Sequence, residues 1–169
     1  MAVVTVKSQQ ITDRDATPKV ISNARVNGAP VQHARGVVTV TATNDIGSKY
    51  LVASIPSNAV PVSLRLTGAD IGAGAAAADI GLYRSTADGG AVVDADFFAS
   101  AFSLAGGPFS KSEQLFESGV ITVANSETKA IWQHLGLSAD PNVMYDIVLT
   151  LTGAADATGA EMVEVDYTQ

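Results

Sequence analysis

The stretch "VSLRLTG", Val62 to Gly68, alternates apolar and polar side chains residue by residue. Because successive side chains of a β-strand point to opposite faces, the apolar side chains at 62, 64 and 66 are expected on one face. The polar side chains between them are expected on the other face. This pattern is typical of a half-buried antiparallel strand that packs one face on a core and turns the other to solvent.

Other segments share this strand-like character, because they are rich in Val, Ile and Thr and several of them alternate. In the last one, "EMVEVDYT", Val163, Val165 and Tyr167 oppose the side chains at 162, 164 and 166. The further predicted strands are residues 3–7, 36–42, 49–56, 78–85, 120–124, 145–153 and 161–168. Turn residues separate them, so the sequence predicts an all-β, antiparallel sandwich of two sheets, and a jelly roll fits the number of strands.

The stretch "DADFFASAFSLAGG" interrupts this pattern and predicts a short helix. Phe97, Phe98 and Phe102 recur at helical offsets, and the segment ends on two glycines. Asp94 or Asp96 is expected at its start, where a carboxylate accepts hydrogen bonds from free backbone N–H groups.

The stretch "SETKAIWQHLGL" predicts a second short helix. Ser126 is expected to cap its start and Gly136 to end it. Ile131, Trp132 and Leu135 would then lie on one side. For Trp132, the only tryptophan, we expect a core anchor rather than an interface residue.

The first 35 residues differ from the rest, because they are polar, contain Gly and Pro, and show weak periodicity. We therefore predict an extended N-terminal arm over residues 1–35, which orders against a neighbouring subunit, and a single sandwich domain over residues 36–169.

The composition excludes several classes of partner. Seventeen Asp and Glu outnumber ten Lys and Arg, and the basic residues are scattered, which argues against nucleic acid and against an anionic membrane surface. There is no cysteine, so disulfides and thiolate metal sites are excluded.

Charged residues make up only 16%, below the roughly 25% of an average soluble domain, which suggests that a partner covers part of the surface. The N-terminus lacks the features of a signal peptide, and we expect a soluble protein made in the cytoplasm.

Three carboxylates, Asp88, Asp94 and Asp96, surround a Gly89-Gly90 pair and resemble a metal-binding loop at first sight. A calcium loop needs side-chain oxygens at alternating positions and a closing Glu, and the middle of this stretch supplies none. We therefore expect no metal here, and we expect Asp88 to form a turn with the two glycines.

The sequence shows no combination of residues that is typical of a catalytic site. His33 and His134 are the only histidines, one in the predicted arm and one in the predicted helix. No Gly-x-Ser-x-Gly elbow is present, and the stretch "GADIGAGAAAADIG" lacks the Lys-Ser/Thr of a phosphate-binding loop. A pair of acidic residues acting on sugars stays open, although no pair is singled out. We expect no catalytic, cofactor-binding or metal-binding residues, no cofactor, and no enzyme activity.

Two long segments, residues 77–107 and 127–159, resemble small structural proteins of tailed bacteriophages, the jelly-roll decoration or cement proteins of the capsid. The resemblance covers roughly the last two-thirds of the chain and is generic before about Lys49. The residues that carry it are Asp79-Ile80-Gly81-Leu82-Tyr83, Gly89-Gly90, Asp94-Ala95-Asp96-Phe97-Phe98, Leu135-Gly136-Leu137, Asp140-Pro141 and Tyr145-Asp146.

The resemblance implies a virion structural protein that is assembled in the host cytoplasm and binds the outer surface of a phage head. Its partner would be the major capsid protein, and it would stabilise the contacts between capsid subunits by adding interface area. Self-association into dimers or trimers is expected for clamps over symmetry axes. The alternative is a carbohydrate-binding, lectin-like jelly roll, which would need an exposed aromatic patch such as Tyr83, Phe97 and Phe98.

Overall fold

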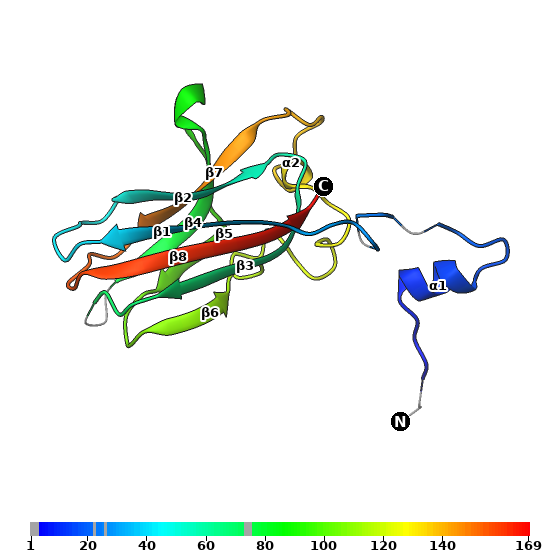
Figure 1. The fold of residues 1–169 in the computed structure, drawn as a ribbon, viewed down its shortest axis with the longest axis horizontal. Coiled ribbons are helices and arrows are strands. Elements are labelled where there is room, and N and C mark those ends of the chain that lie inside the picture. Colours follow the sequence, from blue (N-terminus) through cyan, green and yellow to red (C-terminus); the bar gives the residue numbers. More distant parts are fainter. Residues whose placement is uncertain (1–3, 22, 26, 73–75) are drawn as a thin grey trace.

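The computed structural model describes residues 4–21, 23–25, 27–72 and 76–169, and most of them belong to two four-stranded antiparallel sheets (Figure 1). One sheet has the strand order β1-β8-β3-β6 and the other β2-β7-β4-β5. The strands are β1 (Gln32–Val40), β2 (Lys49–Pro56), β3 (Val60–Gly68), β4 (Ala77–Arg84), β5 (Val92–Ser103), β6 (Phe109–Glu113), β7 (Met144–Leu151) and β8 (Gly159–Thr168). The helices are α1 (Gln9–Asp15), the single 3-10 turn η1 (Thr86–Asp88) and α2 (Ile131–His134).

The strand pairing is that of a jelly roll. The first strand pairs with the last, β2 with β7, β3 with β6 and β4 with β5, as in one long hairpin folded on itself. Two further pairings, β3 with β8 and β4 with β7, complete the sheets. Eight strands in two four-stranded sheets with this nesting are the jelly-roll arrangement, so the predicted fold class is confirmed.

The core lies between the two sheets and is built from the alternating residues that the strand patterns predict. Leu64 and Leu66 of β3 are fully buried and pair across the sheet with Val165 and Val163 of β8. Val62 is the exception, because the register between β3 and β8 shifts between Pro61 and Ser63. This bulge leaves Val62 51% exposed instead of in the core.

The predicted helix at residues 94–107 is wrong, because most of this segment belongs to β5. Ile80 of β4 pairs with Ala99 and Leu82 pairs with Asp94, so four residues of β5 lie opposite Gly81 alone. A Cβ atom on Gly81 would overlap the carbonyl oxygen of Ala95, so the bulged chain passes directly over this glycine. The bulge buries the adjacent Phe97 and Phe98 together, which produces the helix-like spacing in a strand.

The second predicted helix exists but is shorter. Gly136 follows it with a left-handed φ of 70°, as expected for a helix end. Its start is not at Ser126, because the chain before Ala130 forms turns, which also replace the strand predicted at residues 120–124. Trp132 is half-buried and lies outside the core cluster, so the expected core anchor is wrong.

The N-terminal segment lies outside both sheets. Val3 lies outside the described residues, and residues 4–7 form no strand, so the strand predicted at residues 3–7 is wrong for its described part. Helix α1, which was not predicted, is capped by the Ser8 side chain and buries none of its residues. Figure 1 shows this segment projecting from the end of the sandwich near the C-terminus. Strand β1 begins at Gln32, so residues 32–35 of the predicted arm belong to the sandwich.

Candidate functional site

The carboxylates around Gly89 and Gly90 are separated by the fold. Asp88 ends η1, where its side chain accepts a 2.8 Å hydrogen bond from the Ser85 hydroxyl, and both glycines have positive φ, which confirms the predicted turn. Asp94 lies on β5, so neither it nor Asp96 caps a helix as predicted. Burial, and then the neighbouring Asp96, raise the pKa of Asp94. Among the described residues, no group of three or more His, Asp or Glu side chains is arranged to hold a metal ion.

A polar cluster occupies the outer face of β1, β8 and β3. Asp166 of β8 lies between His33 on one neighbouring strand and Arg65 on the other. Its carboxylate is 2.7 Å from His33 Nδ1, accepts a 3.0 Å hydrogen bond from the Ser63 hydroxyl and pairs with the Arg65 guanidinium at 2.5 Å. The sequence placed His33 in a loose arm, and this is wrong, because residue 33 pairs with Asp166 in the sheet.

This cluster joins neighbouring strands through hydrogen bonds and an ion pair to one carboxylate. Partial burial raises the pKa of Asp166, but hydrogen bonds from His33 and Ser63 and the charge of Arg65 outweigh it, and the pKa lies below its ordinary value. Ser63 donates to Asp166 and not to His33, so the cluster lacks the nucleophile-to-base hydrogen bond of a Ser-His-Asp system. Asp166 therefore ties three strands together.

His134 of α2 is a packed residue. Its ring meets Phe97 edge to face with centroids 6.3 Å apart. Burial, and then the charge of Lys129, lower the pKa of His134, so the neutral imidazole is favoured at neutral pH. No nucleophilic side chain is hydrogen-bonded to it among the described residues.

Glu161 of β8 is the one acidic side chain with no exposed surface among the described residues. Both of its carboxylate oxygens are buried, and neither has a hydrogen-bond partner in the described part of the chain. Gly68, its partner on β3, leaves the space that the carboxylate fills, because a Cβ atom there would overlap Glu161 Oε2. Burial raises the pKa of Glu161 to about 7, and the nearby Ala69 backbone N–H lowers it only in part.

The aromatic residues named for a sugar-binding role do not form an exposed patch. Phe97 and Phe98 are fully buried and pack edge to face with centroids 4.8 Å apart. Tyr83 is 5% exposed, and its hydroxyl is 3.2 Å from Thr150 Oγ1. Because stacking on a sugar needs an open ring face, these three residues cannot serve as the platform that the carbohydrate-binding alternative requires.

An open groove of about 250 Å³ lies where the N-terminal segment meets the sandwich. Its lining is mixed, and its apolar part includes the partly exposed Val62 and Phe116. Its lining residues are Gln10, Arg25, Val60, Pro61, Val62, Phe116, Ser126, Glu127 and Thr168. The sequence pattern missed this groove, because the alternation assigned Val62 to the core and the bulge at Pro61 and Ser63 turned it outward.

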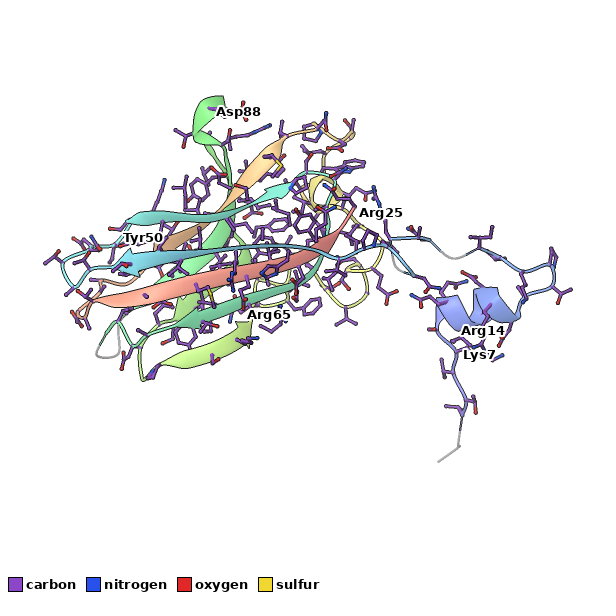
Figure 2. The ribbon with its side chains drawn as sticks, viewed as in Figure 1. Lys7, Arg14, Arg25, Tyr50, Arg65 and Asp88 are labelled. Carbon is purple, nitrogen blue, oxygen red and sulfur yellow. The ribbon has the colours of Figure 1, made fainter. Side chains whose placement is uncertain are left out.

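The N-terminal segment is anchored at the edge of this groove. The Thr168 hydroxyl, at the end of β8, donates a 3.2 Å hydrogen bond to the backbone carbonyl of Arg25. Figure 2 shows Arg25 beside the end of the sandwich, with Lys7 and Arg14 further out along the projecting segment. The groove and the segment therefore form one continuous surface at this end of the molecule.

Within the described residues, none of the helices has the length and apolar character needed to cross a membrane.

Comparison with known proteins identifies the fold but no family. No protein-family model matches the sequence, and no curated protein matches it. The structure is similar to a chain in the "Cyanophage Pam1 capsid asymmetric unit", with a TM-score of 0.54 and 14% identity over 88% of this chain and 91% of that one. It is also similar to a chain in the "Capsid of Ralstonia phage GP4", with a TM-score of 0.50 and 20% identity over 83% of this chain and 84% of that one. At these identities the likeness shows a shared fold.

Proposed function

We propose that this chain is a virion structural protein of a tailed bacteriophage, a decoration or cement protein on the outer surface of the head. It binds the major capsid protein and stabilises the contacts between capsid subunits. In this proposal it catalyses no reaction, needs no metal or cofactor, and acts as an oligomer. The observation that carries the proposal is the nested eight-strand jelly roll, which this chain shares over most of its length with chains from two phage capsids.

The surface supports a binding role. Fourteen large apolar side chains are exposed among the described residues, and five of them lie in the N-terminal segment before β1. They are Val4, Val6, Val20, Ile21 and Val31. Exposed apolar side chains concentrated on a segment that projects from the domain are typical of a surface that a partner covers.

The proposed mechanism is added interface area. The sandwich supplies a rigid body, and the projecting segment extends the contact to a neighbouring subunit. Specific interfaces bury roughly 1,200–2,000 Å² in total, which a rigid face and an extended segment reach together more easily than either alone. Each copy would then oppose separation of the capsid subunits that it bridges.

The proposal is tested by the composition of purified particles. We expect this chain in near-stoichiometric amount with the major capsid protein, and cryo-electron microscopy should place it on the outside of the head. A few copies per particle, or a position at the tail, would contradict the proposal.

A second test adds the purified protein to particles that lack it. We expect binding that saturates and raises the temperature at which the heads open. Removal of residues 1–31 should leave the melting of the sandwich nearly unchanged, because α1 buries no residue, and should abolish particle binding. If the truncated chain still saturates the particles, the N-terminal segment is not the capsid-binding element.

A further inference from the structure

The N-terminal segment contains a strand-like sequence that pairs with no strand in the described part of its own chain. Val4, Thr5, Val6 and Lys7 alternate apolar and polar side chains. Val4 is 74% exposed and Val6 is 84% exposed, and neither belongs to a strand. An extended segment of this kind can bury two valines on one face while the residues between them stay in solvent.

The groove at the base of the segment has the size and chemistry for such an occupant. Its 250 Å³ is below the roughly 300–1,000 Å³ of pockets that take small molecules, and it is open rather than enclosed. Val60, Pro61, Val62 and Phe116 are its apolar lining residues. Glu127, which also lines the groove, supplies a carboxylate for a basic side chain that follows the apolar ones.

The charge distribution favours a contact between the N-terminal segment and a sandwich. Residues 1–31 contain four Lys and Arg against two Asp, a net charge of +2. Residues 32–169 contain six Lys and Arg against fifteen Asp and Glu, a net charge of −9. Opposite charges on two surfaces steer their encounter and suppress wrong contacts.

The segment does not fill the groove of its own chain. Gln10 of α1 and Arg25 already line the groove from the side of the segment. In Figure 1 the chain before α1 runs away from the sandwich. Lys7 is held there by a 2.8 Å ion pair with Asp15. Such an exposed pair contributes little stability, so Lys7 can change partner at small cost.

We propose that Val4–Lys7 of one copy occupies the groove formed by Val60–Val62 and Phe116 of a second copy. Val4 and Val6 contact the apolar lining residues, and Lys7 meets Glu127. The same contact repeats in the opposite direction, and a reciprocal contact of this kind closes with two copies. The inference specifies the self-association within the proposed function, and it does not require a capsid.

Oligomeric state gives the first test. The mass of the isolated full chain in solution is measured by light scattering after size exclusion. We expect a dimer for the wild type, a monomer for Val4→Asp combined with Val6→Asp, and a monomer for Val62→Asp. The matched control Thr5→Asp places the same charge on the opposite face of the segment and should keep the dimer. Circular dichroism checks that each variant is folded.

Disulfide trapping gives the second test, because the wild-type chain has no cysteine. A Val6→Cys chain is mixed with a Val62→Cys chain and oxidised, so a disulfide between the two positions joins different copies. The control partner is Leu51→Cys, an equally exposed β2 residue next to Tyr50, which Figure 2 places at the end of the sandwich opposite to Arg25. We expect a mixed dimer from the first pair and only traces from the control pair.

Three results of these two tests would overturn the inference. They are a monomeric wild type, a dimer that survives the double Val4 and Val6 replacement, and equal trapping by positions 62 and 51. A further control is a chain that carries both Val6→Cys and Val62→Cys. If it forms only an internal disulfide, the segment binds the groove of its own chain, which also contradicts the proposed contact between copies. Each of these outcomes leaves particle binding to be judged by its own experiment, so the two proposals fail separately.

Discussion

Two of the three carboxylates on strand β8, Glu161 and Asp166, face opposite sides of one sheet and differ in almost every physical respect. On the outer face, Asp166 is partly exposed and accepts hydrogen bonds from side chains on both neighbouring strands, and its pKa is lowered. On the inner face, Glu161 is fully buried without a hydrogen-bond partner among the described residues, and its pKa is raised to about 7. The comparison teaches that the face of the sheet sets the direction of the pKa shift, because it decides how much solvent and how many hydrogen-bond partners the carboxylate meets.

The largest expected effect comes from Glu161→Gln at alkaline pH. Because the pKa of Glu161 rises from 4.5 to about 7 on folding, the folded chain loses stability as pH increases from about 4.5 through 7. The shift corresponds to about 3 kcal/mol once the group is ionised. The Gln side chain stays neutral, so the variant should be more stable than the wild type by up to that amount at pH 9, and about equal at pH 4.

The measurement is urea unfolding of both proteins across this pH range. Other titrating groups are common to the two chains and cancel in the difference. A difference that does not change with pH would mean that Glu161 is solvated or paired in solution, which would remove the contrast with Asp166.

Gly68→Ala should disturb the buried Glu161 carboxylate from the neighbouring strand β3. The added methyl group would overlap Glu161 Oε2, so the carboxylate must move inside a packed core, at a cost of about 2 kcal/mol. The cost should fall when Glu161→Ala is present as well, because the overlap is removed. Thermal unfolding of the four proteins in this cycle measures the coupling, and simple additivity would show that the two residues do not share the space.

Asp166→Ala should lower the free energy of unfolding by a smaller amount than the Gly68→Ala replacement. The variant loses hydrogen bonds from His33 and Ser63 and the ion pair with Arg65, and we expect a loss of about 1.5 kcal/mol at neutral pH. Because the folded pKa of Asp166 is lowered, its charged form stabilises the fold above its unfolded value of 3.8, and this contribution disappears as pH falls below that value. Denaturation at pH 7 and at pH 2.5 checks both signs, and an equal loss at the two pH values would show that charge is not involved.

The smallest effect is expected from Ser63→Ala, which removes one 3.0 Å hydrogen bond to Asp166 and leaves the other two partners in place. We expect a loss of about 0.5–1 kcal/mol. The control is Thr39→Ala, an exposed residue of β1 in the same sheet whose hydroxyl makes no hydrogen bond among the described residues. A larger effect from Ser63→Ala than from Asp166→Ala would contradict the description of Asp166 as the centre of the cluster.

The strands that alternate cleanly could be predicted, and those that depend on distant residues could not. Residues 49–56, 62–68, 145–151 and 161–168 form strands as their patterns indicate. Strand β5 was missed because its bulge exists only opposite Gly81, which lies on another strand. Residues 4–7 show the reverse case, because a strand-like pattern without a neighbouring strand forms no sheet.

The candidate surfaces were less predictable than the fold. The groove depends on the bulge that exposes Val62, and the polar cluster depends on His33 pairing with Asp166 from the far end of the chain. The charge difference between the first 31 residues and the rest is visible in the sequence, although its meaning depends on where the segment leaves the sandwich.

By itself the sequence determined that this protein is an all-β sandwich with a distinct N-terminal segment, because alternation, turn residues and composition are local properties. Only the tertiary structure decided which strands are neighbours and that Phe97 and Phe98 lie in a bulged strand. It also decided that Glu161 is buried with no hydrogen-bond partner among the described residues, and that Val62 is exposed to solvent. The physical reason is that each of these features depends on contacts between residues far apart in the chain, and the energy of such contacts does not appear in any local pattern.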